Sequence, residues 1–142
     1  MTVNSYKLDD GTLKLGAAGV MDISCQVTSA IAQASENVST TDAIPVLCGD
    51  EVPEEDEVKL NWTLSFNVVQ DLDAAGVIAW SYTNKGTEQD FEFIPTTAGA
   101  RKVTGTVRVI PIAIGGDVRT RPQAENTWQG KKGEDFVFAA VV

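Results

Sequence analysis

Residues 58–68, VKLNWTLSFNV, decide the fold of this chain, because apolar and polar side chains alternate along them. The apolar set shares one parity and comprises Leu60, Trp62, Leu64, Phe66 and Val68. The polar set shares the other and comprises Lys59, Asn61, Thr63, Ser65 and Asn67. Successive side chains of a strand point to opposite faces, whereas a helix would scatter both sets around its circumference. The stretch therefore predicts a long β-strand that buries its apolar face, at roughly 1.5–3 kcal/mol per side chain before the entropy of ordering.

The polar face of this strand carries one charge, that of Lys59. Two interpretations stay open. It is either the solvated face of an ordinary β-sandwich, or a face that meets other subunits or lines a cavity.

The composition indicates one globular domain with an ordinary core. The chain has 142 residues, of which 43% are hydrophobic and 22% charged. No apolar run is long enough to predict a membrane span, and residues 1–11 lack the pattern of a secretory signal. Cys25 and Cys48 are too few for a disulfide framework, so we expect buried thiols in a protein made in a reducing compartment.

The charge is negative overall and unevenly distributed. The net charge of −9 argues against a tight grip on nucleic acid, which rests on Lys and Arg. Residues 1–100 carry 16 acids and 4 bases, a net of −12, whereas residues 101–142 carry 4 acids and 7 bases, a net of +3. Either copies of the chain meet head to tail through complementary patches, or the charges are scattered over a solvated surface.

Local patterns predict further strands and one helix. We expect a strand at 12–15, and another at 22–35 with Cys25 facing the core, although its later part could be helical. Further strands are expected at 87–95 with Phe91 and Phe93 inward, at 103–114 with a bend or bulge near Pro111, and at 135–142. Residues 71–85 predict a helix capped by Asp71, with Leu72, Ala75, Ala79 and Tyr82 near one face. The apolar C-terminal strand either completes the domain's own sheet or adds to another subunit's edge.

Residues 36–57 are less regular and contain the acidic run DEVPEEDE at 50–57, with Glu51, Glu54, Glu55, Asp56 and Glu57 among its acids. One interpretation is a solvated loop. We favour a segment ordered against a neighbouring subunit, because Ile44, Val46 and Leu47 need a place to be buried. A divalent-cation site is disfavoured, because the spacing of a calcium loop is absent.

The sequence lacks the residues of most catalytic sites. It has no histidine, which removes the commonest general base and every Ser-His-Asp or Cys-His arrangement. The cysteines lack zinc or redox spacing, and no glycine-rich phosphate loop is present. The carboxylates cluster in an expected surface loop, which disfavours a glycosidase pair. We therefore expect a β-rich structural or interaction domain without catalytic residues, metal or cofactor.

Five motifs stand out along the chain: GTLKLG at 11–16, ISCQVTS at 23–29, VLCGD at 46–50, AAGVIAW at 74–80 and GTVRVIPIAIGGDVRTRP at 105–122, the last followed by Trp128. Together they resemble the major tail tube proteins of long, non-contractile-tailed bacteriophages, particularly those of actinobacteria. The strand containing Trp62 adds to them, and FVFAAVV at the C-terminus does not match closely.

The resemblance implies a mainly β fold, an antiparallel β-barrel or sandwich with one flanking helix, in a single domain spanning 1–142. It implies hexameric rings of this chain, stacked into the virion tail in the host cytoplasm, alongside tape measure and terminator proteins. DNA would pass through the tube without tight binding, and no membrane would be involved. The polar set of residues 59–67 would face the lumen or solvent, and an arm at 1–11, the acidic segment 36–57 and the segment 118–142 would make subunit contacts.

Within those contacts, we expect the acids of residues 51–57 to face four bases, Arg119, Arg121, Lys131 and Lys132. A capsid decoration or head–tail connector protein of similar β fold is the alternative. A carbohydrate-binding sandwich is disfavoured, because only three Trp and two Tyr are present.

Overall fold

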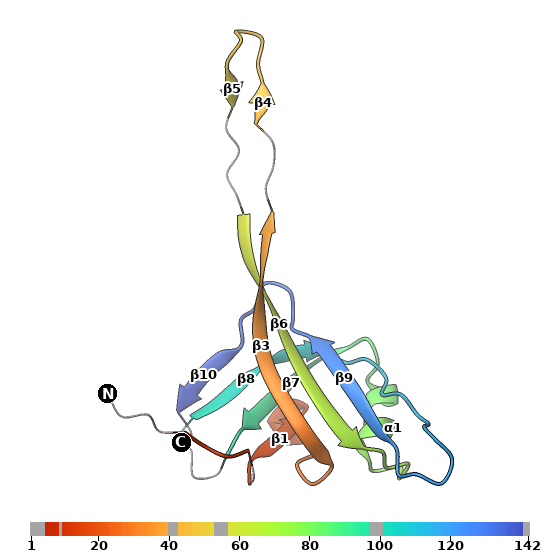
Figure 1. The fold of residues 1–142 in the computed structure, drawn as a ribbon. Helices are drawn as coiled ribbons and strands as arrows, with labels where there is room; N and C mark the ends of the chain where they lie inside the picture. Colours follow the sequence, from red (N-terminus) through yellow and green to blue (C-terminus); the bar gives the residue numbers. More distant parts are fainter. Residues whose placement is uncertain (1–4, 9, 40–42, 53–56, 97–100, 141–142) are drawn as a thin grey trace.

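A computed structural model describes residues 5–8, 10–39, 43–52, 57–96 and 101–140. The elements, in chain order, are β1 (Thr12–Leu15), the 3₁₀ turn η1 (Ala17–Gly19), β2 (Met21–Asp22), β3 (Val27–Ser39), β4 (Ile44–Pro45), β5 (Glu51–Val52), β6 (Glu57–Val69), α1 (Val77–Thr83), β7 (Glu88–Ile94), β8 (Arg101–Arg108), β9 (Gln123–Gln129) and β10 (Val137–Ala140). The expected mainly β, antiparallel fold with one helix is confirmed in its sandwich form, because the sheets do not close into a barrel (Figure 1).

The decisive stretch forms β6, the middle strand of a three-stranded sheet ordered β3-β6-β9. Leu64, Phe66 and Val68 are buried, and Trp62 is partly buried against the core. Leu60 was expected inside and is instead 52% exposed. The reason is that β9 pairs with β6 only from Thr63 onward. Leu60 therefore lies in the part of β6 that projects beyond the sandwich.

The second sheet has five strands in the order β10-β8-β7-β1-β2. Its inward side chains include Leu13, Leu15, Phe91, Phe93 and Val107, which confirms the inward placement of the two phenylalanines. The two sheets meet at Gly130, whose N–H donates to the Trp62 carbonyl at 2.6 Å and which also forms a bridge with Val107. Lys131 N–H then donates to the Thr106 carbonyl, so the turn after β9 ties one sheet to the other.

Aromatic side chains fill the space between the sheets. Trp128 meets the edge of Phe66 at 4.9 Å between ring centroids and stacks on Trp80 of α1 at 6.4 Å. Phe136 packs against Phe91 at 4.7 Å and Trp62 at 5.3 Å. Trp80 of the helix and Phe136, the residue before β10, therefore both contribute aromatic rings to the core.

The helix is shorter than predicted, because the acids at its expected start serve a turn. Asp71 Oδ1 accepts from the N–H of Asp73, and α1 begins only after Gly76, which provides no side-chain cap. Its buried residues are Val77, Ile78 and Ser81, so the predicted face containing Leu72 and Tyr82 was wrong. Leu72 is 73% exposed.

The predicted strand at 22–35 was wrong in its start, and no part of it is helical. β2 ends at Asp22 and a turn follows, in which the N–H of Gln26 donates to the carbonyl of Ile23. A register shift between Val27 and Ser29 then resets the parity of β3. Cys25 consequently lies exposed in the turn, and Cys48 is exposed as well, so neither is the buried thiol we expected.

The chain after residue 100 differs from the prediction in two places. β8 ends at Arg108, earlier than the predicted strand end at 114. The expected change of face near Pro111 is confirmed, because the buried residues are odd-numbered before it (Val107 and Val109) and even-numbered after it (Ile112). β9 lies in a segment for which no strand was predicted. β10 pairs with β8 along 137–140 and so completes the domain's own sheet.

Candidate functional site

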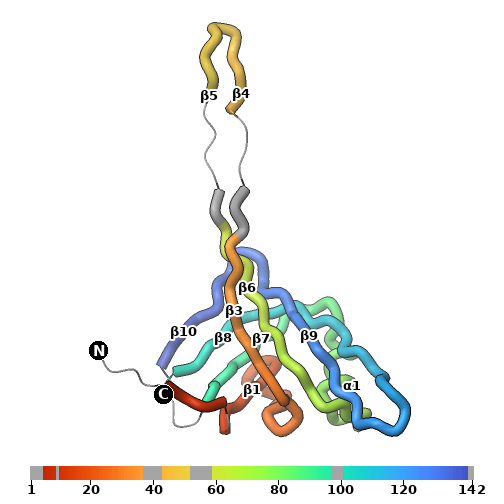
Figure 2. The backbone as a smooth tube through the Cα atoms, viewed as in Figure 1, coloured from red at the N-terminus to blue at the C-terminus, as the bar shows by residue number. Residues whose placement is uncertain are grey.

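The most prominent feature is a hairpin that projects from the sandwich (Figure 1). β3 and β6 remain paired from Ser39↔Glu57 to Ala34↔Trp62, a region in which β9 contributes no partner. Beyond it, β4 pairs with β5 at the far end, away from the body (Figure 2). Within the range 36–57, which was expected to be irregular, the described residues 36–39, 44–45, 51–52 and 57 therefore belong to paired strands. A two-stranded ribbon is at best marginally stable alone in water, so a partner surface would stabilise this one.

We call the described end of this hairpin, residues 43–52, the tip. Ile44, Val46 and Leu47 are 52%, 38% and 106% exposed there. The exposed carboxylates of Asp50 and Glu51 lie within the same segment. The other predicted contact acids are placed differently: Glu57 begins β6, and Glu54, Glu55 and Asp56 lie outside the described residues.

A second surface lies at the opposite end of β6, and we call it the basal patch: Val69, Leu72, Ile114, Val118, Arg119 and Arg121. All six side chains are exposed. Gln70 holds the two segments together, since its side-chain amide donates to the carbonyl of Gly115 at 2.9 Å and accepts from its N–H at 3.0 Å. The N–H of Gln70 also donates to the carbonyl of Pro122. The loop that carries Arg119 and Arg121 is thereby fixed to the end of β6 that is farthest from the tip (Figure 1).

The four predicted contact bases do not form one group. Arg119 and Arg121 belong to the basal patch, whereas Lys131 and Lys132 follow β9 on the side of the hairpin. Lys131 is paired within its own chain, with Glu134 at 3.3 Å and Glu88 at 3.6 Å. Its hydrogen bond to Glu134, followed by the charges of Glu134 and Glu88, raises its pKa above the ordinary value. Lys132 is exposed.

The polar residues of β6 form a continuous face with those of its neighbours. Ser65 stands between Ile31 and Thr127, and Thr63 between Gln33 and Gln129, in the register of the sheet. Ser65 and Thr127 hydroxyls are 3.3 Å apart. Asn61 is exposed, whereas Thr63, Ser65 and Asn67 are half-buried. Among the described side chains of this face from Ser29 to Ser35, from Asn61 to Asn67 and along β9, Glu125 carries the one charge. Lys59 lies farther out, on the hairpin.

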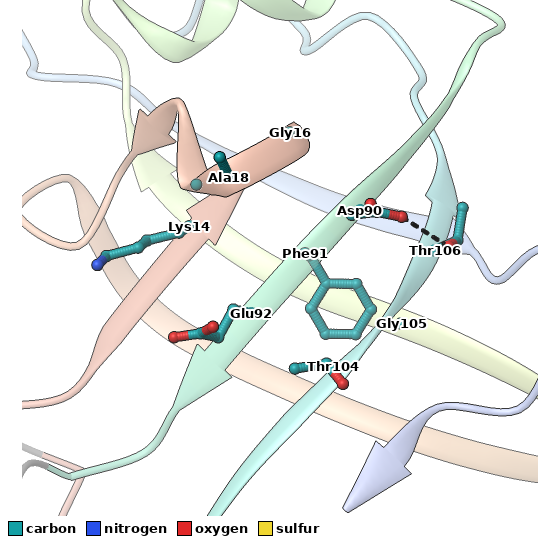
Figure 3. A pocket seen from close by; sticks show the side chains of 10 residues that line it. Lys14, Gly16, Ala18, Asp90, Phe91, Glu92, Thr104, Gly105 and Thr106 are labelled. Atoms are coloured by element: carbon teal, nitrogen blue, oxygen red, sulfur yellow. Dashed lines mark hydrogen bonds between the residues drawn. The ribbon is translucent and has the colours of Figure 1, made fainter. Parts of the chain in front are cut away.

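An open depression of about 510 Å³ lies on the outer side of the five-stranded sheet (Figure 3). Its lining includes Lys14, Asp90, Glu92, Thr104 and Thr106. The Thr106 hydroxyl donates to Asp90 at 2.9 Å, and Lys102 pairs with Glu92 at 3.6 Å. Asp90 and Glu92 are thus engaged with neighbours on the same sheet, and this arrangement does not indicate catalysis.

Within the described part of the chain, Cys, Asp and Glu side chains do not gather in threes as a metal site would require. No helix in that part of the chain is long and apolar enough to cross a membrane. The exposed Ile114 of the basal patch was not predicted as a contact residue, whereas the exposed Val118 lies in the predicted contact segment 118–142 but was not singled out there. Ile110, Ile112 and Ile114 alternate along the sequence, yet only Ile112 of the three is buried. Ile110 and Ile114 are therefore exposed apolar side chains.

The fold is similar to that of chains in solved structures of assembled particles. One is a chain in the tail of an empty gene transfer agent particle refined with C6 symmetry, with a TM-score of 0.51 and 16% identity over 81% of this chain and 83% of that one. Another is a chain in the virion of a native gene transfer agent particle, with a TM-score of 0.54 and 17% identity over 90% and 95%. No protein-family model and no curated protein matches the sequence. At these identities the likeness establishes a shared fold.

Proposed function

We propose that this chain is a structural subunit of a phage-like tail, which assembles into hexameric rings that stack as a tube for the delivery of DNA. It would act without catalysis, with itself and other tail proteins as partners. The two solved structures of similar fold support the proposal, because they come from a tail with C6 symmetry and from a virion.

The single observation that carries the proposal is the unfinished hairpin. A ribbon without a third strand leaves backbone donors and acceptors along both of its edges. Its tip exposes three apolar side chains within four residues. A neighbouring copy would supply both the missing strand pairing and the missing apolar cover.

The polar face of β3-β6-β9 suits the wall of a DNA conduit. Hydroxyl and amide groups such as those of Thr63, Ser65 and Gln129 keep a wall wet. The sparse charge and the absence of Lys or Arg from this face within the sheet body would let phosphates pass without being held. We place this face toward the lumen and the five-stranded sheet outward.

Negative-stain microscopy and mass measurement of the purified chain test the proposal. We expect rings at low concentration and tubes of constant width at high concentration. A chain that stays monomeric at every concentration would contradict it. Closed trimers or single rings that never stack would favour a capsid decoration or connector protein instead.

A further inference from the structure

We propose that residues 130–136 form a latch, which holds the root of the hairpin against the five-stranded sheet and opens without unfolding of the sandwich. The root is Trp62, the point at which β6 leaves its ladder with β9. A closed latch gives the hairpin one direction, and an open latch lets that direction vary. The inference concerns the single chain and does not depend on ring formation.

The first contact of the latch is with the backbone of Trp62. The N–H of Gly130 donates to the carbonyl of Trp62 at 2.6 Å. A Cβ on Gly130 would lie 3.0 Å from that carbonyl oxygen, 3.1 Å from Cβ of Trp62 and 3.0 Å from Cε1 of Phe136. These distances are shorter than ordinary van der Waals contact, so glycine allows the latch and β6 to approach closely.

The second contact is with the side chain of Trp62. Its indole N–H donates to Oδ1 of Asp135 at 2.9 Å, and its ring centroid lies 5.3 Å from that of Phe136. The Phe136 ring belongs to the core, whereas the bond to Asp135 is exposed to solvent. Because water competes for both partners, the net contribution of such a bond is modest. The bond can therefore break while the core stays packed.

The latch is fixed to the five-stranded sheet on its other side. The N–H of Lys131 donates to the carbonyl of Thr106 in β8 at 2.8 Å, and its ammonium pairs with Glu88 of β7 at 3.6 Å. Lys131 also pairs with Glu134 at 3.3 Å, across a turn in which Gly133 has φ 84°. β10 follows the latch directly. The latch thus connects the hairpin root with three strands of the other sheet.

Exposure makes the latch weaker than the sandwich to which it belongs. The side chains of Lys131, Glu88 and Glu134 are 40%, 39% and 53% exposed. Exposed ion pairs contribute little and are screened by salt. Beyond the root, the described pairs of β6 are with β3 alone. Local opening at the root should therefore require less free energy than global unfolding.

Hydrogen exchange read by mass spectrometry measures the opening, with the chain diluted below the concentration at which it assembles. Asp135→Ala removes the acceptor of the indole N–H, so amide exchange of the peptide containing Gly130 should become roughly three- to tenfold faster. Asp135→Asn keeps an oxygen acceptor, and its exchange should stay within about twofold of wild type. The amide of Ile112, which donates to Ser81, should exchange at the wild-type rate in both variants.

A double-mutant cycle tests the bond between Trp62 and Asp135 itself. Trp62→Phe keeps an aromatic ring beside Phe136 and removes the N–H donor. Adding Asp135→Ala to it should speed exchange at Gly130 no further, because the bond is already lost. Independent, multiplying effects would overturn the latch. Asp117→Ala is the matched control, since it removes an exposed acid outside the latch and should leave this exchange unchanged.

Single-molecule energy transfer tests whether the latch sets the direction of the hairpin. In a Cys25→Ser, Val20→Cys background, one dye lies just before β2 and the other on the native, exposed Cys48 of the tip. Adding Gly130→Pro with Asp135→Ala removes both donors and acceptors that the latch offers to the root, and should shift the mean transfer efficiency. Adding Asp135→Asn alone should not.

Two results would overturn the latch. One is unchanged exchange at Gly130 in Asp135→Ala, and the other is an unchanged transfer efficiency when both contacts are removed. Thermal unfolding of each variant shows that the sandwich is intact, and the exchange measurement on Asp135→Ala decides the question if the doubly substituted chain does not fold. Because both measurements use single chains, they bear on the latch and not on the proposed tube.

Discussion

The buried hydroxyl of Ser81 accepts a hydrogen bond from the backbone N–H of Ile112 at 3.1 Å. It also donates to the carbonyl of Ile78 at 2.7 Å, and Ser81 is completely buried. The bond fastens α1 to the irregular segment that follows β8. That segment continues into Ile114 and the basal patch, so the helix helps to position this exposed surface.

Ser81→Ala should lower the free energy of unfolding by about 1–3 kcal/mol, because it leaves the buried N–H of Ile112 without an acceptor. Urea unfolding of the purified chain measures this free energy. Thr83→Ala is the control, since its hydroxyl donates to the Ala79 carbonyl at an exposed position, and we expect a change within about 0.5 kcal/mol. Equal effects of the two substitutions would contradict the role assigned to Ser81.

Gly105→Ala should destabilise the sandwich by about 1–3 kcal/mol through overpacking. A Cβ at this position would lie 2.4 Å from Cδ1 of Phe136, whose ring is held by Phe91 and Trp62. The measurement is again denaturant unfolding, with Thr104→Ala on the outer side of β8 as control. An unchanged midpoint for Gly105→Ala would mean that Phe136 moves without loss.

The free energy of unfolding at acidic pH should depend on Asp22. Its carboxylate accepts hydrogen bonds from the hydroxyl and N–H of Ser24, and these lower its pKa below the usual value. A lowered folded-state pKa adds stability above the unfolded value of about 3.9, and this is lost as pH falls through the folded value. Asp22→Asn should therefore lose less stability than wild type as the pH falls below about 4. Identical pH dependence of the two proteins in urea titrations would refute this.

Reversing both patch arginines, as Arg119→Glu with Arg121→Glu, should weaken stacking. Each exposed pair contributes roughly 0–1 kcal/mol, so the effect arises by repetition around the ring and from new repulsion of the tip. Shorter tubes by negative-stain microscopy are the expected result, and Lys85→Glu, near the end of α1, is the control. Unchanged tube lengths would exclude a role for these charges.

Local alternation made part of this fold predictable. The bounds of β1 and the inward faces of β6 and β7 follow from period-two patterns that neighbouring strands reinforce. β9 was missed because only Ala124 and Trp128 are buried along it. The start of α1 was misplaced because Asp71 and Asp73 resemble helix caps but serve preceding turns.

The residues of the candidate site could be named from the sequence, but their arrangement in space could not. The sequence led us to favour a neighbouring subunit over solvent as the surroundings of residues 43–57, and to expect Arg119 and Arg121 to face their acids, and both stay predictions. It did not indicate that β3 and β6 carry the tip far from the body, because that depends on pairing between distant segments. For the same reason Lys131 was grouped with the arginines, although Glu88 and Glu134 already hold it.

The central claim is that a neighbouring copy of this chain supplies the strand pairing and the apolar cover that the hairpin lacks. A cryo-electron microscopy reconstruction of the purified, assembled protein tests this claim most directly. We predict stacked six-fold rings, consistent with the symmetry of the similar tail. In them, Asn61, Thr63, Ser65 and Asn67 should line the lumen, and each hairpin should contact a second copy of the chain. Monomers whose hairpin contacts no other copy, or rings with the polar face turned outward, would contradict the account.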